Sequence, residues 1–327
     1  MPTQPVAGHA NTPTVMTAGP SRPRSAGEDV GGMQAAGVDM SFVDGAVDLY
    51  VHGSPDLVPR AMDDIALARQ IQAARYSAAL HRHQFMPTAD RARIVADLTG
   101  FQLFGAIVLN DTAGGLNLRA VEYALRMGAV WVGLPTVDAR HARGLLPAAI
   151  PGILSAVTFG RVIDVVDESG GVLPVLRELL DLVRDYDSVL SLGYLSTPET
   201  LAVARAACEQ RVRSIVLSNP VMRSQEMALE DVETVLGLDH RIWLEVSAFQ
   251  FHRDSNPRVS SADIARLVRA IGPSRTVLSS DGGIAGTLNP PQLLAWGCAQ
   301  LLSEGLHERE IDMMVRKNPR KLIAVET

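Results

Sequence analysis

Short apolar runs alternate with amphipathic segments along the chain, and this alternation is the feature that most limits the possible folds. The runs are rich in β-branched residues and carry few charges, which is typical of parallel strands buried on both faces. The eight strand candidates are residues 46–52, 76–83, 103–110, 129–135, 188–195, 213–219, 241–249 and 276–283.

Between these runs, apolar residues recur three and four positions apart, which predicts helices that cover a sheet. Several of these segments begin with a capping residue and end on glycine, such as Thr88 to Gly100 and Asn289 to Gly305. Eight strand and helix alternations predict an α/β fold, the (β/α)8 TIM barrel. A doubly wound open sheet is the competing fold. It usually has an early glycine-rich phosphate loop, and no G-x-G-x-x-G follows the first strand here.

Two long segments depart from the repeat. Residues 1–40 are rich in Pro, Gly, Ala, Thr and Ser without an apolar period, so we expect a disordered leader. Residues 41–327 then form a single barrel domain. Residues 136–172, between the fourth and fifth strands, are too long for a plain loop and predict an insertion with a lid or a small hairpin. The tail, residues 307–326, predicts one or two closing helices.

The charge pattern limits the possible partners. The net charge is -6, and acidic and basic residues are interspersed, which argues against nucleic acid or an anionic membrane and favours a small-molecule substrate. No apolar stretch reaches the length of a membrane span. Cys208 and Cys298 lie outside any paired Cys motif, so we expect a reducing, cytoplasmic location. A homo-oligomer is a common default for such proteins.

Polar residues follow the predicted strands at their carboxyl ends, where barrels of this class carry their active sites. Asp48, Tyr50 and His52 alternate at the end of the first strand, so we expect all three to point at the barrel axis as catalytic groups. The alternative is that Asp48 caps a neighbouring backbone. Asp281, in the run SSDGG after the last strand, is the candidate general base or metal ligand. Its structural alternative is a residue that only shapes a turn.

Two further candidates lie on other strands. His81 and His83, two apart at the end of the second strand, form a possible metal-binding pair; in the alternative, only one of them faces inward. Glu245, within WLEVSAF, is a catalytic carboxylate candidate with a raised affinity for protons or a cation. An outward position beside a basic partner is its alternative.

Several residues are candidates for binding the substrate. Arg60 and Arg91 open the first and second helices, where a cation is unfavourable unless it serves an anion such as a carboxylate or phosphate. The alternative for both is a solvated surface position. Polar side chains at other strand ends complete the set, namely Asp138, Tyr194 and Asn219.

Longer stretches carry a family resemblance. The first strand has the pattern D-x-x-x-H, the last ends in S-D-G, and NPRKLIAVE closes the chain. With VDLYVHGSPDLVPRA, HQFMPTADRA and GLPTVDA, these stretches resemble the amidohydrolase superfamily of barrel hydrolases from about residue 44 onward. The resemblance is greatest to an uncharacterised branch related to phosphotriesterase-like proteins.

That resemblance implies one or two divalent metals, held by H-x-H on the first strand, a carboxylate or modified lysine, histidines on strands five and six, and the last aspartate. His52 matches the second histidine and Asp281 the general base that serves a metal-bound water. Tyr50, Tyr194 and Asn219 stand where imidazoles are expected, and zinc prefers imidazole, thiolate or carboxylate. The resemblance therefore implies either a reduced site for zinc, manganese or iron on His52, His81, His83 and Asp281, or no metal.

The leading hypothesis is an amidohydrolase-like enzyme that hydrolyses a small carbonyl, amide or ester-type substrate by general acid and base chemistry, in specialised metabolism. A metal-independent lyase, isomerase or cyclase on the same barrel is the second hypothesis. A catalytically silent ligand-binding relative is the third.

Overall fold

The structure is a computed structural model that describes residues 39–149 and 159–325. Within these ranges, eight strands pair in parallel and in chain order. This arrangement confirms the predicted (β/α)8 barrel. The strands are β1 (Val47–Val51), β2 (Ala78–His81), β3 (Leu103–Val108), β4 (Ala129–Gly133), β5 (Val189–Ser191), β6 (Ser214–Ser218), β7 (Ile242–Ser247) and β8 (Thr276–Ser279).

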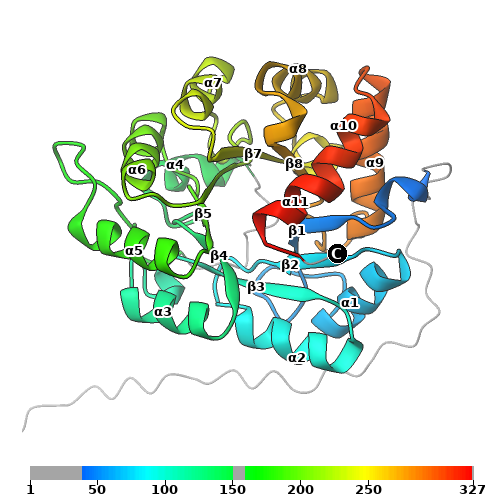
Figure 1. Cartoon of the computed structure of the whole chain (residues 1–327), viewed down its shortest axis with the longest axis horizontal. Helices are drawn as coiled ribbons and strands as arrows, with labels where there is room; N and C mark the ends of the chain where they lie inside the picture. The colour runs from blue at the N-terminus through cyan, green and yellow to red at the C-terminus, as the bar shows by residue number, and fades with distance from the viewer. Residues whose placement is uncertain (1–38, 150–158, 326–327) are drawn as a thin grey trace, which may run out of the picture. The chain divides into compact units, whose positions relative to one another are not determined.

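Helices cover the outside of the strands (Figure 1). Capping residues start several of them: the side chain of Asn289 accepts a hydrogen bond from the backbone of Gln292, that of Ser196 from Glu199, and that of Ser260 from Asp263. The α-helices are α1 (Asp64–Ala73), α2 (Ala89–Thr99), α3 (Leu118–Arg126), α4 (Arg140–Ala149), α5 (Pro174–Asp185), α6 (Thr197–Glu209), α7 (Leu229–Gly237), α8 (Ser261–Ile271), α9 (Pro290–Ser303), α10 (Glu308–Asp312) and α11 (Asn318–Leu322). None of the helices in the described ranges is long and apolar enough to cross a membrane.

The predicted closing helices are confirmed at the amino-terminal end of the barrel. Helices α10 and α11 flank a π-helical turn, η6 (Met313–Lys317). Leu322, Ile323 and Val325 then pack with the innermost strand residues, among them Trp131 and Trp243. These apolar side chains close the bottom of the barrel, so polar groups inside it can meet substrate only from the opposite end.

The insertion contains both a helix and a small hairpin. Helix α4 occupies its first part, and Val166 pairs antiparallel with Val172 in its last part, as predicted. The middle of the proposed lid, residues 150–158, lies outside the described residues, and so does the predicted leader up to residue 38.

The ends of the sheet meet between β1 and β8. Val51 bridges to Gly282, and the backbone N–H of His52 donates to the Gly282 carbonyl at 3.0 Å. Gly283 packs so closely here, at a φ of +124°, that an added Cβ would collide with the His52 carbonyl oxygen. Glycine is therefore required at this seam.

We expect Gly283→Ala to lower the free energy of unfolding by roughly 2–5 kcal/mol, since it adds backbone strain and a collision with another backbone segment. Gly286→Ala is the matched control. Its φ is also positive, +83°, but no atom lies within 4 Å of the added Cβ, so this variant isolates the backbone strain. Urea unfolding followed by circular dichroism measures both variants. If Gly283→Ala and Gly286→Ala lost the same free energy of unfolding, the packing at the seam would not be tight.

Candidate active site

An arginine occupies the centre of the barrel, where sequence reasoning looked for metal ligands. In β2, Ala78 and Leu80 point into the barrel, and the same alternation turns Arg82 inward just past the strand. Its two terminal nitrogens donate to the two carboxylate oxygens of Glu245, at 3.0 and 2.5 Å. The predicted Glu245 carboxylate is thus buried inside the barrel, opposite a fixed cation.

Aromatic rings hold this guanidinium in place. Its central carbon lies 4.0 Å from the ring centre of Tyr50 and 3.8 Å from that of Trp131. Ser279 donates a further hydrogen bond to Glu245 at 2.9 Å. A fork-shaped cation between two π faces, with its charge matched by a bidentate carboxylate, is a rigid arrangement. We call this arrangement the floor of the site, because the residues described next lie directly above it.

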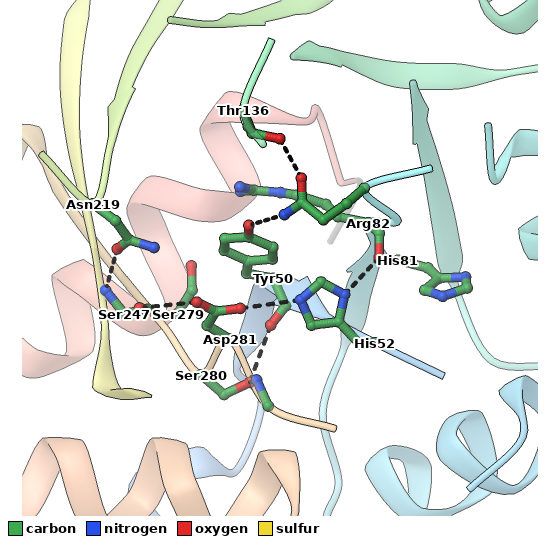
Figure 2. Close-up of polar contacts among 12 residues, drawn as sticks. Tyr50, His52, His81, Arg82, Thr136, Asn219, Ser247, Ser279, Ser280 and Asp281 are labelled. Atoms are coloured by element: carbon green, nitrogen blue, oxygen red, sulfur yellow. Dashed lines mark hydrogen bonds and ion pairs between the residues drawn. The ribbon is translucent and has the colours of Figure 1, made fainter. Parts of the chain in front are cut away.

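Directly above that floor, His52 and Asp281 share a proton. The His52 Nδ1 atom lies 2.7 Å from the carbonyl oxygen of Arg82, which can only accept, so Nδ1 carries a hydrogen. The other ring nitrogen, Nε2, lies 3.0 Å from Asp281 Oδ1 (Figure 2). A hydrogen bond between these two atoms requires one proton on either of them. The pair can therefore both give and take a proton.

Burial places the proton affinity of this pair in a useful range. Desolvation raises the pKa of Asp281 to about 7, although the charges of Arg82 and Arg60 oppose the rise. Desolvation, helped by Arg60, holds the pKa of His52 well below its usual value. The proton between Nε2 and Oδ1 therefore leaves near neutral pH, and its loss is a property of the two residues together. Groups that gain and lose a proton near neutral pH are typical of acid and base catalysts.

A chain of hydrogen bonds orients the two tyrosines. Asn110 donates to Thr136 at 2.8 Å, Thr136 to Gln84 at 2.5 Å, and Gln84 to the Tyr50 hydroxyl at 2.9 Å. The Tyr50 oxygen thus accepts from Gln84, and its own hydrogen is available for the Tyr194 hydroxyl, 3.3 Å away. We infer that the Tyr194 hydrogen points into the cavity. Burial raises the pKa of both phenols, so both stay protonated donors.

These groups line one cavity at the carboxyl end of the strands. Its empty volume, which includes space open to solvent, is about 540 Å³. The polar lining consists of Tyr50, His52, Arg60, Gln84, Tyr194, Ser224 and Asp281. The apolar lining consists of Val58, Val137, Leu146, Met222, Phe249 and Ile284.

Asp48 does not share a side with Tyr50 and His52, contrary to prediction. The pairing of β1 with β2 is irregular between Asp48 and Val51, and this irregularity breaks the alternation, so that Leu49 points inward as well. Asp48 lies on the opposite side and accepts hydrogen bonds from the backbones of Tyr50 and Ser280 at 3.1 and 3.0 Å. It follows the structural alternative for this residue, a carboxylate that caps neighbouring backbone.

The two histidines at the end of β2, His81 in the strand and His83 just past it, are also turned away from the dyad. His81 Nε2 accepts from the Gly53 backbone and lies 3.5 Å from Asp64 of α1. His83 Nδ1 accepts from two backbone N–H groups, and its Nε2 faces Pro55 and Asp56. Both rings therefore hold the loop between β1 and α1 in place. Arg82, between them, takes the inward position.

Among the other predicted residues, Arg60 and Tyr194 line the cavity and three do not. Arg91 pairs with Asp64 beside α1. Asp138 pairs with Arg143 of α4 and accepts from the backbone of Asp111. Asn219 accepts from the backbone of Ser247, whose hydroxyl lies 3.5 Å from Asp281. These side chains position loops and the groups that surround the cavity.

The residues present do not fit a divalent metal. His52 Nε2 and Asp281 face each other, and the side chains of Tyr50 and Tyr194 beside them are phenols, which zinc binds less readily than imidazole, thiolate or carboxylate. The predicted set of His52, His81, His83 and Asp281 is not brought together. Within the described ranges, no group of three or more His, Cys, Asp or Glu residues is arranged to hold a metal ion. The nearby Arg82 and Arg60 charges would also oppose a cation.

Sequence reasoning missed Arg82, Gln84 and Ser224. The inward direction of Arg82 could have been read from Ala78 and Leu80, because alternation continues past the strand. The other two lie on loops after β2 and β6, where side-chain direction follows no period. Only the folded chain reveals that they face the cavity.

Comparison with known families gives one match over most of the barrel. A model described as "Family of unknown function (DUF6282)" matches residues 45–243, which is more than half of the chain. The chain belongs to this family. A search of curated proteins finds no match. The part of the DUF6282 chain covered by the family model contains His52, Arg82 and Tyr194, whereas Asp281 lies beyond it.

Solved structures share the fold of this DUF6282 protein. An amidohydrolase from Burkholderia multivorans with bound HEPES has a TM-score of 0.56 and 12% identity, and covers 86% of this chain and 99% of its own. An amidohydrolase from Pseudomonas aeruginosa has a TM-score of 0.56 and 11% identity, with 87% and 97% covered. A 2,6-dihydroxybenzoate decarboxylase bound to 2,6-dihydroxybenzoate has a TM-score of 0.52 and 12% identity, with 86% and 100% covered. At these identities the likeness shows the fold alone, a (β/α)8 barrel.

The position of Asp48 predicts a pH-dependent stability. Desolvation raises the pKa of this carboxyl from 3.8 to about 7. Between these two values the folded state keeps a proton that the unfolded chain has lost, so this group's contribution to stability falls as the pH rises. We expect the free energy of unfolding of Asp48→Asn, relative to that of the wild type, to rise by roughly 1–3 kcal/mol when the pH is raised from 5 to 8. Urea unfolding at the two pH values measures this difference. A difference that does not change with pH would contradict the buried, protonated state.

Proposed function

We propose that this protein is an enzyme that moves a proton on a small carbonyl compound, with His52 and Asp281 as its acid and base. The observation that carries the proposal is the hydrogen bond from His52 Nδ1 to the Arg82 carbonyl oxygen. It fixes the ring so that Nε2 faces Asp281, and this pair opens into the cavity. Above about pH 7 the pair loses its shared proton and serves as a base; below that pH it serves as an acid.

Tyr194 supplies the second half of the chemistry. When a base removes a proton next to a carbonyl group, negative charge develops on the carbonyl oxygen. A neutral phenol held in a buried cavity stabilises that charge by donating a hydrogen bond. Tyr50 and Gln84 keep the Tyr194 hydroxyl in the donor orientation. These residues account for the proton transfer without a metal ion, as in the hypothesis of a lyase, isomerase or cyclase.

Hydrolysis of an amide or ester is the second candidate. It is favoured by the fold shared with two proteins named amidohydrolases, whereas the decarboxylase among the structural neighbours favours the first candidate. In hydrolysis, Asp281 would take the proton of an attacking water.

We further propose that the protein is related to the phosphotriesterase-like branch, with Tyr50, Tyr194 and Asn219 in place of imidazoles. We also propose that it acts in the cytoplasm, in specialised metabolism, as a homo-oligomer.

Exchange in D₂O tests the first candidate without a known product. We expect the wild type to catalyse hydrogen exchange next to the carbonyl group in members of a panel of small oxo acids, ketones, lactones and amides, as monitored by proton NMR. Asp281→Asn and His52→Ala should lower the exchange rate at least about 100-fold, the usual contribution of a positioned acid or base. Arg93→Gln, on the exposed face of α2, is the control and should keep the full rate.

The same spectra separate the two candidates. Exchange without bond cleavage supports the lyase or isomerase class, and a cleaved amide or ester supports a hydrolase. If neither reaction depended on Asp281 and His52 in any compound, catalysis at this dyad would be the wrong idea.

Metal removal gives an independent prediction. Because the donor set lacks the imidazoles that a divalent cation needs, we expect dialysis against EDTA to leave the reaction rate unchanged within about twofold. Elemental analysis of protein purified without chelator should find less than stoichiometric zinc, manganese or iron. A rate that falls with EDTA and returns with one of these metals would overturn the metal-independent mechanism.

A further inference from the structure

Two polar side chains line the cavity but have no part in the dyad or the tyrosine pair. Arg60 comes from the loop between β1 and α1, and Ser224 from the loop between β6 and α7. Both are hydrogen-bond donors, and both are held in well-packed parts of the chain. What they could bind indicates which kind of molecule the cavity takes.

The Arg60 guanidinium is fixed in place, and only some of its hydrogen-bond donors have a partner. Only 3% of its side chain is exposed, and its Nε and Nη2 atoms both lie 2.6 Å from one oxygen of Asp56. No described residue provides a partner for the remaining Nη1 amine. The backbone around Arg60 is pinned to the loop after β8, because Ala61 donates to the Gly283 carbonyl and Ala285 to the Pro59 carbonyl. The guanidinium is therefore held ready for an acceptor in the cavity.

Ser224 provides a second donor, independent of Arg60. The residue is 1% exposed, and its hydroxyl has no hydrogen-bond partner among the described residues. A buried hydroxyl without a partner costs free energy, because it has given up its hydrogen bonds to water. Its loop is anchored, since the ring of His141 on α4 contacts the Gln225 carbonyl oxygen at 2.7 Å. A ligand that accepts a hydrogen bond from Ser224 would remove this cost.

Charge in the cavity favours an anion. Asp56 neutralises one edge of Arg60, and Glu245 neutralises Arg82, while His52 and Asp281 together are neutral when they share a proton. The Arg60 charge still reaches the dyad, where it adds to the effects that set the pKa of His52 and Asp281. Because the other charges are matched, the Arg60 guanidinium, which Asp56 contacts along one edge only, is the group that an anion in the cavity would bind.

The rest of the wall is apolar. Val58, Val137, Leu146, Met222, Phe249 and Ile284 line it with carbon atoms that favour an uncharged, compact body. The remaining donors of Arg60 and the one hydroxyl of Ser224 are few for a phosphate dianion, which has three terminal oxygens that need hydrogen bonds. They suit the smaller charge of a carboxylate.

We propose that the substrate is a small organic acid with a compact apolar body, whose carboxylate binds Arg60 and whose second acceptor receives the hydrogen bond of Ser224. Its reacting carbonyl then lies toward Tyr194 and the dyad. This last part rests on the proposed function, whereas recognition of the carboxylate requires no turnover. The two ideas can therefore fail separately.

Binding of unreactive acids tests the proposal. Benzoate, cyclohexanecarboxylate and butyrate are titrated into the wild type at pH 7 by ligand-observed NMR, together with benzamide and phenyl phosphate. We expect at least one acid to bind, and benzoate to bind at least 10-fold more tightly than the uncharged benzamide of similar shape. We expect Asp281→Asn to keep this binding even though it loses the proton-transfer reaction.

Variants assign the binding to the two donors. Arg60→Gln should weaken the affinity for the acid at least 10-fold, and Ser224→Ala threefold or more, while Arg93→Gln should leave it unchanged. Because Arg60→Gln leaves Asp56 buried without its partner, the double variant Asp56→Asn with Arg60→Gln provides a charge-neutral check that avoids this burial cost. Circular dichroism confirms that each variant is folded.

Three results would overturn the proposal. The first is that no acid binds to the wild type at millimolar concentration. The second is that benzamide binds as tightly as benzoate, or that the folded double variant binds the acid like the wild type. The third is that phenyl phosphate binds more tightly than benzoate and depends on Arg60, which would assign the cavity to phosphate esters instead.

Discussion

The ion pair between Arg82 and Glu245 is the interaction on which the site depends. Two opposite charges buried inside a barrel are costly to desolvate, and the cost is met only when their geometry is good and their other hydrogen bonds are satisfied. Here the pair is bidentate, Ser279 adds a donor, and the Tyr50 and Trp131 rings cover the guanidinium, whose Nε atom alone has no hydrogen-bond partner among the described residues. The carbonyl of the same arginine fixes the ring of His52. One residue thus sets the charge, the packing and the proton position of the cavity.

This pair also gives a physical reason for the two phenols near it. The Arg82 guanidinium supplies permanent positive charge inside the barrel, and the Tyr50 ring covers it. A tyrosine can stack on a guanidinium and still use its hydroxyl in a hydrogen bond, whereas an imidazole in the same position could itself gain a charge. The Tyr50 hydroxyl meets that of Tyr194 at 3.3 Å. The arginine and the two phenols are then parts of one arrangement.

Sequence reasoning predicted the barrel and brought His52 and Asp281 to the same place, because strand order and strand ends follow from the apolar repeat. It failed where side-chain direction depends on local detail. One irregular pairing in β1 turned Asp48 away from the cavity. Alternation made Arg82, rather than His81 or His83, the inward residue of β2. Asp138 and Arg91 are polar residues near strand ends that the chain uses to tie its loops, and their sequence context does not distinguish that use from substrate binding.

The seam of the barrel has a meaning beyond stability. His52 and Asp281 follow the first and last strands, which are separated by almost the whole domain and meet only where the sheet closes on itself. No half of the barrel contains both residues. A chain still emerging from the ribosome therefore cannot form this pair until β8 has been made and has closed the sheet against β1. Closure of the barrel and assembly of the proposed dyad are one and the same event in folding.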